Sequence, residues 1–476
     1  MAERETIAGL HKQVKAAFHK TKNIEFRQKQ LENLALLLKE QEEALCEAVY
    51  KDLKRPPNQT ALEVTTAIND LNDIKSNLKR YLAPERKKSG WLLDYVKNPA
   101  FAGDTQEVRL EPLGVVLIFG AWNFPIVLSL QPLFGAIAAG NCVLLKPSEQ
   151  SPNTAHLLDS LISKYLDNEC YKVVVGGPEV GALLLELEWN HIFYTGGAST
   201  AHKIMEAAAK HLTPVTLELG GKSPAFIDKS CDLQKTARMI AWAKTFNCGQ
   251  ICVSVDYALC LHSQLMDFIE YVKQAWKEFY GEVEQSSDYS RIVNTTHFDR
   301  LVGLLRNTSG QIVYGGKQLN RDDLFIEPSI VVVSSLDDCL MKEEIFGPIL
   351  PILPYESLEQ AFQWIDNNPV LEQPLVLYIF STDSIAEEQI IERIPSGGVC
   401  INEVISHVMS SWLPFGGIGK SGMGVYHGKY SIQVFSHYRA VLKRRFLMEP
   451  LVGKIRYPPA TNRKNWLLGM LTRQRI

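Results

Sequence analysis

The sequence predicts an α/β protein in which a parallel, doubly wound sheet is followed by a second α/β segment. Between residues 113 and 217, short apolar runs alternate with longer segments of helical periodicity. Strands that alternate with helices of about 10 to 15 residues imply right-handed crossovers between parallel strands. No charged residue occurs from Pro112 to Leu145, a run of 34 residues. Strands of parallel sheets read as such unbroken apolar runs because both of their faces are covered.

The composition fits a folded chain of roughly three domains. Of the 476 residues, 46% are hydrophobic and 22% are charged, which excludes a disordered, collagen-like or coiled-coil protein. The net charge of −3 does not favour nucleic acid as a partner. Nine scattered cysteines indicate a reducing compartment, and the first residues lack the apolar core of a secretory signal. We therefore expect a cytoplasmic protein.

The uncharged run could be mistaken for a membrane span, which needs about 20 continuous apolar residues. It is interrupted at Asn123-Phe124-Pro125, at Gln131-Pro132 and at Gly140-Asn141. These residues start or break helices. We therefore interpret the run as strand, turn, helix and strand in the buried centre of the fold.

The elements follow from periodicity and from their boundary residues. Near the N-terminus, apolar residues from Phe26 to Leu53 recur at helical intervals, and Asn23 is expected to cap this helix. The strands expected next are Leu113–Phe119, Cys142–Leu145, Val173–Val175 and His191–Tyr194. The helices expected with them are Pro125–Ala139, Thr154–Lys164, Pro178–Leu187 and Thr200–His211. The second α/β segment extends from about Glu218 to about Cys400, with apolar runs at Ile330–Val333 and Leu375–Phe380.

The C-terminal segment differs in charge from the rest of the chain. Residues 439–476 contain three Lys, seven Arg and one acid, Glu449, for a charge of +9. Within it, residues 466–471 are apolar and have basic residues on both sides. Such a segment could lie peripherally on an anionic membrane surface. The simpler interpretation, which we favour, is that it docks on the acidic body or on a second subunit.

Two cysteines, Cys248 and Cys252, lie in the segment NCGQICV. This spacing could supply half of a metal site, but zinc would need two more Cys or His ligands, and no CxxC or HxxxH partner occurs. We predict no metal. The better interpretation is that one of the two is a thiolate nucleophile, although any single cysteine could be an inert core residue.

Two polar residues lie where apolar strands are expected to end. Glu218 stands between two leucines before Gly220-Gly221. Burial there would raise the pKa of its carboxyl group and suit it to act as a general base, although the same pattern alone also fits an ordinary exposed Glu on an edge strand. Asn123 lies where a strand meets a helix. Its amide could donate to a developing oxyanion or merely cap the helix.

Two further motifs suggest contacts with a cofactor. Lys146 and Glu149, in KPSE, follow a buried strand, where doubly wound sheets bind ligands. The segment from His191 to Thr200 runs from a strand through Gly196 into a helix, and free N–H groups at a helix N-terminus favour a phosphate. Neither motif matches G-x-G-x-x-G.

These motifs occur together in one chain as LELGGKSP, GQICV, EPLGVVLIFGAWNFP, LLKPSE, EEIFGPIL and PFGGIGKSGMG. The chain resembles the NAD(P)-dependent aldehyde dehydrogenases over roughly residues 5 to 460. The segments MEAAAKHLTPVTLELGG and GVYHGKYSIQVFSHYR are most similar to class 3, the group that includes fatty and aromatic aldehyde dehydrogenases.

The resemblance implies a role for each motif. Cys252 is expected to be the nucleophile, Glu218 the general base and Asn123 the oxyanion amide, whereas Cys248 has no required role. The implied cofactor is NAD or NADP, with contacts at Lys146, Glu149, Gly196, Ser199, Leu219, Glu344 and Phe346. A substrate pocket is expected around Trp122, His407 and Trp412.

The resemblance also implies a domain organisation and a homodimer. Residues 1–80 and 104–217 would form a Rossmann-like cofactor domain, and residues 218–400 would form the catalytic domain. Residues 81–103 and 425–450 would form a small bridging and oligomerisation element, followed by the basic tail at 451–476.

The reaction implied is the oxidation of medium- to long-chain aliphatic or aromatic aldehydes to carboxylic acids. Cys252 would form a thiohemiacetal and then an acyl thioester, which water activated by Glu218 would hydrolyse. Two alternatives are a CoA-acylating aldehyde dehydrogenase and a non-catalytic binding protein on the same scaffold.

Two positions depart from the family pattern. Ala201 stands where the family commonly has the second glycine of the phosphate loop, and Ile251 stands where many class members have Thr. Cofactor affinity or the preference between NAD and NADP is expected to differ accordingly.

Overall fold

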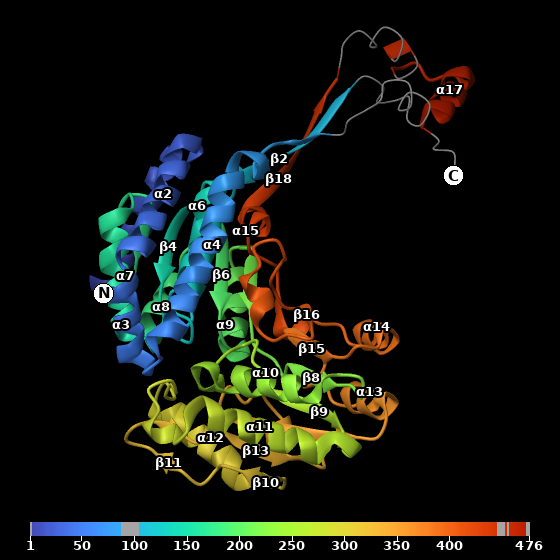
Figure 1. Ribbon diagram of the computed structural model, residues 1–476. Coiled ribbons are helices and arrows are strands. Elements are labelled where there is room, and N and C mark those ends of the chain that lie inside the picture. Colours follow the sequence, from blue (N-terminus) through green and yellow to red (C-terminus); the bar gives the residue numbers. More distant parts are fainter. Residues whose placement is uncertain (1, 87–103, 445–452, 455–456, 473–476) are drawn as a thin grey trace. The chain divides into compact units, whose positions relative to one another are not determined.

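The computed structural model describes residues 2–86, 104–444, 453–454 and 457–472. They divide into two compact units (Figure 1). Residues 1–77 and 113–435 belong to the larger unit, and residues 78–112 and 436–476 belong to the smaller one.

The first sheet of the larger unit is doubly wound. In the described part of the chain its strand order is β17-β7-β6-β3-β4-β5, and all pairs are parallel except β17 with β7. The strands are β3 (Val115–Phe119), β4 (Cys142–Lys146), β5 (Tyr171–Val173), β6 (His191–Thr195), β7 (Val215–Glu218) and β17 (Gly422–Met423). The chain leaves β3 toward β4 and β5 and returns to β6 on the other side of β3, so the strand order reverses between β3 and β6. Doubly wound sheets bind ligands at this switch point.

The crossover helices confirm the predicted pattern of alternation. They are α6 (Val127–Ala139), α7 (Pro152–Tyr165), α8 (Pro178–Leu185) and α9 (Ala198–Ala209). Two boundaries differ from the prediction: β5 begins two residues earlier than expected, and α6 begins after Pro125 rather than at it. Single-residue boundaries depend on hydrogen bonding of the end residues, which apolar patterning does not determine.

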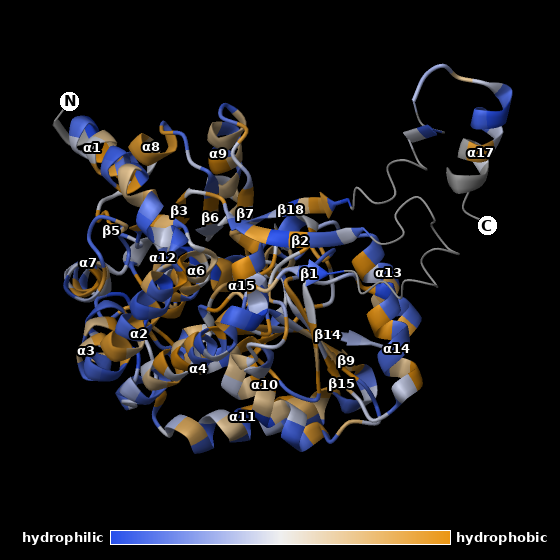
Figure 2. Ribbon diagram, turned by 90° about the horizontal axis from the view of Figure 1, so that it is seen from above, coloured by the Kyte–Doolittle hydropathy of each residue, from blue (hydrophilic) through white to orange (hydrophobic). Residues whose placement is uncertain are grey.

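The helices of the N-terminus cover this sheet. They are α1 (Ala2–Ala17), α2 (Ile24–Glu40), α3 (Glu42–Leu53) and α4 (Pro57–Tyr81). The Asn23 side chain accepts hydrogen bonds from the N–H groups of Glu25 and Phe26, which confirms the predicted cap. Helix α2 packs along α6 and α3 packs along α7. Figure 2 shows hydrophilic and hydrophobic residues alternating along α2 and α3, as expected of helices with one buried face.

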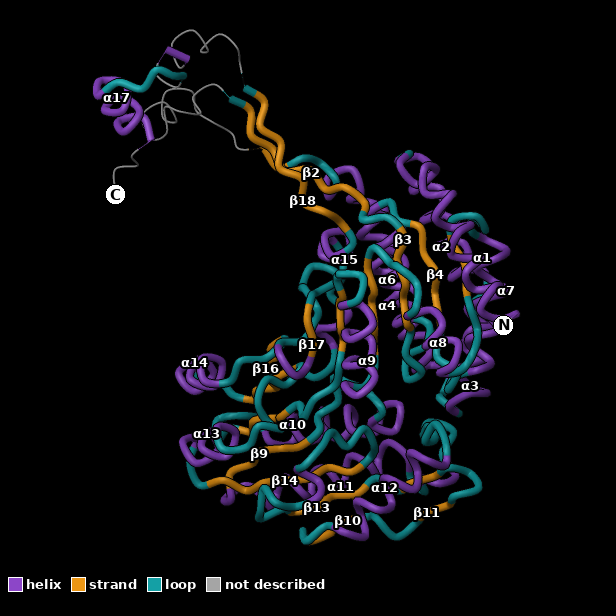
Figure 3. The backbone as a smooth tube through the Cα atoms, turned by 180° about the vertical axis from the view of Figure 1, so that it is seen from behind, coloured by secondary structure: helices purple, strands orange, loops and turns teal. Residues whose placement is uncertain are grey.

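The second sheet of the larger unit begins directly after β7. Its order over the described residues is β10-β13-β14-β9-β8-β15-β16, parallel except for β10. The strands are β8 (Pro224–Ile227), β9 (Tyr257–Leu261), β10 (Gln311–Tyr314), β13 (Ser329–Val332), β14 (Ile349–Tyr355), β15 (Val376–Phe380) and β16 (Gly398–Ile401). Figure 3 shows β9, β14, β13 and β10 side by side. The chain therefore passes from one sheet to the other within residues 219–223.

Helices cover both faces of this second sheet. Hydrophobic residues of α10 (Leu233–Thr245) and α11 (Leu265–Tyr280) pack on one face. Residues of α12 (Thr295–Asn307), α13 (Leu358–Asp366) and α14 (Ser384–Arg393) pack on the other. Coverage of both faces explains the unbroken apolar runs in the sequence.

The smaller unit is built on an antiparallel ribbon. Strand β2 (Thr105–Pro112) pairs with β18 (Ser436–Lys443) along its whole length and with the short β1 (Glu85–Arg86). This pairing places residues 104–112 with the ribbon, whereas the sequence assigned them to the cofactor domain. Residues 425–435 lie in the larger unit, where α15 (Lys429–Val434) packs on α6. Residues 87–103 and 445–450 of the predicted bridging element lie outside the described residues.

The basic tail contains the helix α17 (Asn462–Thr472). Trp466 on this helix is exposed, and the side chains of Leu468, Met470 and Leu471 lie outside what is described. Of the helices described, none is long and apolar enough to cross a membrane. Peripheral membrane contact through the tail stays a prediction.

Candidate active site

Cys252 lies at the end of a tight loop that follows α10. Asn247, Cys248 and Gly249 have φ values of 49°, 54° and 71°, so three consecutive residues adopt the left-handed conformation. A Cβ at Gly249 would come within 2.4 Å of the carbonyl oxygen of Gly347, which explains the glycine. The loop leaves Cys252 partly exposed.

The two cysteines of this loop face different surroundings. Cys248 is buried, and its thiol donates to the carbonyl of Ser290 at 2.9 Å. Cys252 lines a cavity. Burial raises the pKa of the Cys252 thiol to about 12, and the carboxylates of Glu344 and Glu218 add to the rise. Because the thiolate is the reactive form, a proton acceptor beside Cys252 would be needed to generate it.

Glu218 is the last residue of β7 and is 3% exposed. Neither of its carboxylate oxygens has a hydrogen-bond partner among the described residues. Burial raises the pKa of this carboxyl group well above its usual value, as predicted from its position between two leucines. A carboxylate whose pKa is raised by burial is a stronger base than an exposed one, as suits a general base.

Asn123 lies on the turn between β3 and α6. Its side-chain amide donates to the carbonyl of Gln250 at 3.1 Å, so it points toward the loop that carries Cys252. An amide nitrogen has two N–H groups, and this bond uses one of them.

Asn123 and Cys252 line one cavity of about 310 Å³. Most of its wall is apolar and comes from α4, α6, α10 and residues 403–427. The remaining lining residues are Leu62, Glu63, Thr66, Phe124, Val127, Leu128, Gln131, Trp242, Phe246, Ile251, Val253, Glu403, Val404, Ile405, Ser406, Val408, Met409, Phe415, Tyr426 and His427. The contribution of α4 could not be seen in the sequence.

The three aromatic residues predicted to form the substrate pocket lie elsewhere. The ring of Trp122 packs against His297 and Phe346, with centroids 5.4 Å apart in both cases. His407 lies behind Phe415, with centroids 6.5 Å apart. Trp412 is 71% exposed. None of the three is among the residues that line the cavity.

Glu344 and Phe346 lie next to the turn that follows Glu218. A Cβ at Gly220 would come within 1.9 Å of a carboxylate oxygen of Glu344, so any larger residue there would displace the Glu344 carboxylate. Burial raises the pKa of Glu344 to about 8, and the nearby carboxylate of Asp256 adds to this while the backbone N–H of Gly221 opposes it. Phe346 has a left-handed φ of 48°.

A buried ion pair anchors this segment. The ammonium group of Lys222 contacts Asp256 and donates to the carbonyls of Leu340 at 2.7 Å and Glu343 at 3.1 Å. The second carboxylate oxygen of Asp256 accepts from the N–H of Ile345 at 3.0 Å. The sequence analysis missed both residues, because an ion pair between distant positions leaves no local pattern.

The predicted cofactor residues gather at the carboxyl ends of the first sheet. Lys146 ends β4 and contacts Glu149 at 2.8 Å. Gly196 follows β6, and a Cβ there would come within 2.3 Å of the Tyr194 hydroxyl oxygen. Ser199 lies in the first turn of α9, and the N–H of Leu219 donates to the carbonyl of Ser421 at 3.1 Å.

These residues fit a dinucleotide. They lie at the point where the strand order reverses, and the free N–H groups at the start of α9 favour a phosphate. The hydroxyl oxygen of Thr195, at the end of β6, is buried and has no partner among the described residues. A bound ligand with polar groups would satisfy it.

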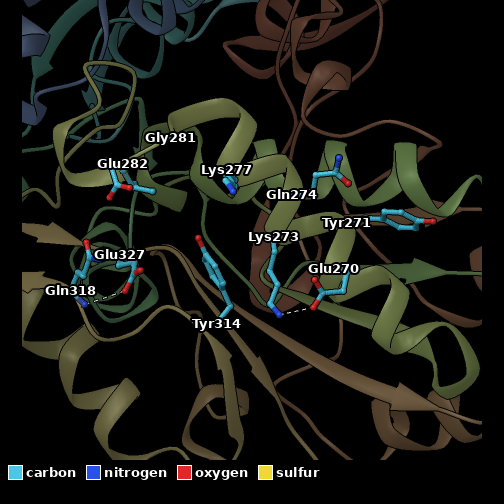
Figure 4. Close-up of a pocket in the computed structure, with 11 residues that line it drawn as sticks. Glu270, Tyr271, Lys273, Gln274, Lys277, Gly281, Glu282, Tyr314, Gln318 and Glu327 are labelled. Carbon is cyan, nitrogen blue, oxygen red and sulfur yellow. Dashed lines mark hydrogen bonds and ion pairs between the residues drawn. The ribbon is translucent and has the colours of Figure 1, made fainter.

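A more open cavity of about 520 Å³ lies between α11 and the edge strand β10 (Figure 4). Its charged residues include Lys273, which contacts Glu270, and Glu327, which accepts from the N–H groups of residues 317 and 318. None of the predicted site residues lines it. In the described part of the chain, no group of three or more His, Cys, Asp or Glu side chains could hold a metal ion.

Two largely parallel sheets joined just after the buried Glu218, a cavity lined by Cys252, and a polar site at the switch point of the first sheet define an α/β protein of the dinucleotide-binding class. The aldehyde dehydrogenase family model matches residues 1–441, and the chain belongs to this family. The protein is therefore an NAD(P)-dependent oxidoreductase that acts on aldehydes. The predicted resemblance and fold class are confirmed.

Known relatives match almost the whole chain. "Aldehyde dehydrogenase family 3 member A2" of Pongo abelii is 43% identical, with 94% of this chain and 89% of the relative covered. "Aldehyde dehydrogenase, dimeric NADP-preferring" of Canis lupus familiaris is 44% identical, with coverage of 95% and 98%. The substrate-bound structure of Staphylococcus aureus AldH superposes with a TM-score of 0.91 at 35% identity, covering 98% of this chain and 99% of that one.

Proposed function

We propose that this enzyme oxidises apolar aldehydes to carboxylic acids through an acyl thioester on Cys252. The observation that carries the proposal is the cavity that Cys252 and Asn123 share. Its other walls are almost entirely apolar, so an aliphatic or aromatic chain is favoured over a charged one. A carbonyl group at the cysteine would therefore place its apolar chain along α4 and α10.

Each proposed residue acts on a defined atom. Glu218 accepts the proton of the Cys252 thiol, and the sulfur then bonds to the aldehyde carbon while the carbonyl π bond opens. The resulting oxyanion accepts a hydrogen bond from the Asn123 amide, an interaction of about 3–4 kcal/mol in comparable sites. The tetrahedral carbon must lose a hydride, which no protein side chain can accept; NAD or NADP, held at its nicotinamide end by Glu344, Phe346 and Leu219, would supply the hydride acceptor. The carbon–oxygen double bond then re-forms as a thioester.

Hydrolysis completes the cycle. Glu218 first releases to solvent the proton that it took from Cys252 and then takes a proton from water. The water oxygen bonds to the acyl carbon, the carbon–sulfur bond breaks to release the carboxylic acid, and the proton on Glu218 returns to the Cys252 thiolate. A buried base with two unpartnered oxygens supports hydrolysis over transfer of the acyl group to CoA, because CoA already supplies a thiol as nucleophile.

The cofactor is proposed to lie along the carboxyl ends of β3, β4 and β6. Lys146 and Glu149 would hold the adenosine ribose, and Gly196 with Ser199 would lie beside the pyrophosphate. Glu344, Phe346 and Leu219 would contact the nicotinamide end. The name of the dog relative, NADP-preferring, supports use of NADP as well as NAD.

The chain is proposed to act as a homodimer in the cytoplasm. The name of the same relative includes the word dimeric. The edge strand β16 carries the exposed apolar side chains of Val399 and Ile401, as expected where a second chain docks. The nine free cysteines support a reducing compartment.

The experiment is to quench the enzyme during turnover of octanal with NAD or NADP and to locate the acyl group by peptide mass spectrometry. We expect the adduct on Cys252, and octanoic acid as the product whether or not CoA is present. Cys248→Ser is the matched control and should keep the adduct, whereas Cys252→Ala should lose it and still bind NADH. An adduct on another residue would refute the assignment, and octanoyl-CoA as the product would favour the acylating alternative.

A further inference from the structure

A buried ion pair lies where α3 meets α4, outside every motif of the site. Arg55 is 0% exposed and Glu63 is 3% exposed, and their side chains contact each other. Charged groups at this depth are costly unless their remaining donors and acceptors are satisfied. The backbone groups that bind these two side chains belong to the turn of residues 123–127.

Glu63 caps the helix that follows Asn123. One of its carboxylate oxygens accepts from the N–H groups of Ile126 and Val127, both at 2.8 Å. These N–H groups lie at the start of α6, where the side chain of the N-cap residue, Ile126, makes no hydrogen bond to them. A carboxylate in this position also interacts favourably with the helix dipole.

Arg55 holds the other end of the same turn. Its guanidinium donates to the backbone carbonyl of Asn123 at 2.9 Å and to the hydroxyl of Thr60 at 3.2 Å, and it lies 4.6 Å from the ring centroid of Phe124. Arg55 and Glu63 thus fix the turn of residues 123–127 at both ends.

The same corner also holds the nucleophile loop. The side-chain oxygen of Gln59, between Arg55 and Glu63, accepts from the N–H of Asn247 at 3.1 Å. The Asn247 amide donates in turn to the carbonyl of Asn123 at 3.0 Å. The turn that carries Asn123 and the loop that carries Cys252 are therefore tied to one another through residues 55–63.

We propose that Arg55 and Glu63 are positioning residues that set the Asn123 amide relative to Cys252. The inference rests on the proposed oxyanion role of Asn123. The planar guanidinium reaches the Glu63 carboxylate and the Asn123 carbonyl at once, which the single ammonium group of a lysine cannot do. Loss of this bridge allows the Asn123 turn to shift, while the hydrogen bond from the Asn247 N–H to Gln59, which Arg55 does not make, still holds the loop that carries Cys252.

The test uses Arg55→Lys, which keeps the buried charge, and Arg55→Met, which removes it. We expect Arg55→Lys to lower the first-turnover rate of NADH formation from octanal by about tenfold, and Arg55→Met by up to about a hundredfold, the scale of a lost oxyanion donor. The dissociation constant of NADH and the rate of Cys252 alkylation by iodoacetamide should stay within about twofold, because neither depends on Asn123. If Arg55→Met fails to fold, Arg55→Lys carries the test.

Arg27→Met is the matched control. Arg27 is a buried arginine that donates to the backbone carbonyls of Thr21 at 2.6 Å and Ala138 at 3.3 Å, at the opposite end of α6. The Arg27→Met substitution should lower thermal stability but leave the first-turnover rate of the folded enzyme unchanged. The comparison separates loss of positioning from general destabilisation of α6.

A double-mutant cycle with Asn123→Ala tests whether Arg55 acts through Asn123. If Arg55 acts through Asn123, Arg55→Lys will change the rate less than about twofold once the amide is absent. An equal loss in both backgrounds, or no loss when Asn123 is present, would overturn the positioning role while leaving the proposed function intact. An unchanged rate in Asn123→Ala alone would instead overturn the oxyanion assignment and this inference with it.

Discussion

The backbone N–H of Gly196 donates a hydrogen bond of 3.0 Å to the carbonyl oxygen of Glu218. The bond continues the parallel pairing of β6 with β7, in which Thr195 is opposite Glu218. It places the proposed phosphate turn and the proposed general base on adjacent strand ends. In the proposed mechanism, one pair of strands therefore positions both the cofactor contact and the base that activates water.

Replacing Glu218 with Gln is expected to stall the enzyme after the first turnover. Gln cannot take a proton from water, so the acyl thioester should accumulate while steady-state turnover falls by about 10²- to 10⁴-fold, the usual contribution of a general base. Rapid mixing should then show a burst of NADH followed by a slow phase, and mass spectrometry should show acylated Cys252. Undiminished steady-state turnover would exclude Glu218 as the base.

Asp70 is expected to make the enzyme less stable as the pH rises. One of its oxygens accepts from the N–H of Gly428 at 2.8 Å and the other is buried without a described partner. Burial raises the pKa of this carboxyl group to about 7 from its usual 3.8. The folded state therefore keeps a proton that the unfolded state has lost, and the free energy of unfolding should fall by up to about 1.4 kcal/mol per pH unit between these two values.

Asp70→Asn should remove this pH dependence, because its side-chain oxygen can still accept from Gly428 and it carries no charge. Urea unfolding of both proteins between about pH 4 and pH 8 measures the difference. The variant should gain stability relative to the native enzyme as the pH rises. Parallel stability curves would show that the charge on Asp70 is compensated in the folded state.

A larger side chain at Thr66 is expected to shorten the accepted substrate. Thr66 lines the cavity from α4, so Thr66→Phe should lower kcat/KM for dodecanal by about tenfold or more while acetaldehyde is affected little, because only the long chain reaches this wall. The adjacent Thr65 is exposed, and Thr65→Phe is the matched control. If both substitutions changed the chain-length profile alike, the cavity would not be the substrate site.

Lys222→Met is expected to destabilise the protein by about 3–5 kcal/mol, since it leaves the buried carboxylate of Asp256 without its cation. The exposed pair of Lys342 and Asp337 offers the control, and Lys342→Met should cost less than about 1 kcal/mol. Denaturant unfolding of the two variants measures the loss of stability in each. Because Lys222 also holds the segment with Glu344, weaker NADH binding should accompany the loss of stability.

Residues next to strand ends were the most predictable part of the site. Glu218 and Asn123 were identified because each follows an apolar run, and such a run indicates a strand. The turn after a strand lies on the ligand-binding side of a doubly wound sheet. Cys252 needed the family resemblance, since the residues around it do not distinguish a reactive thiol from a buried one such as Cys248. The strands themselves followed from burial on both faces.

Long-range contacts could not be predicted. Thr66 on α4 lies in the same cavity wall as Phe246 and Tyr426, and nothing in the local sequence of α4 signals this. The pairing of β2 with β18 joins segments more than 300 residues apart. Residues 104–112 therefore belong with the ribbon and not, as expected, with the cofactor domain. Trp412 was expected in the pocket because it is aromatic, but the direction of a side chain depends on backbone geometry that its neighbours in sequence do not reveal.

The cavity takes its walls from both early and late parts of the chain, from Leu62 to His427. During synthesis on the ribosome, Cys252 emerges long before Phe415, Tyr426 and His427, which complete the cavity around it. A stalled or prematurely released polypeptide that ends before residue 426 would carry the proposed nucleophile without these walls.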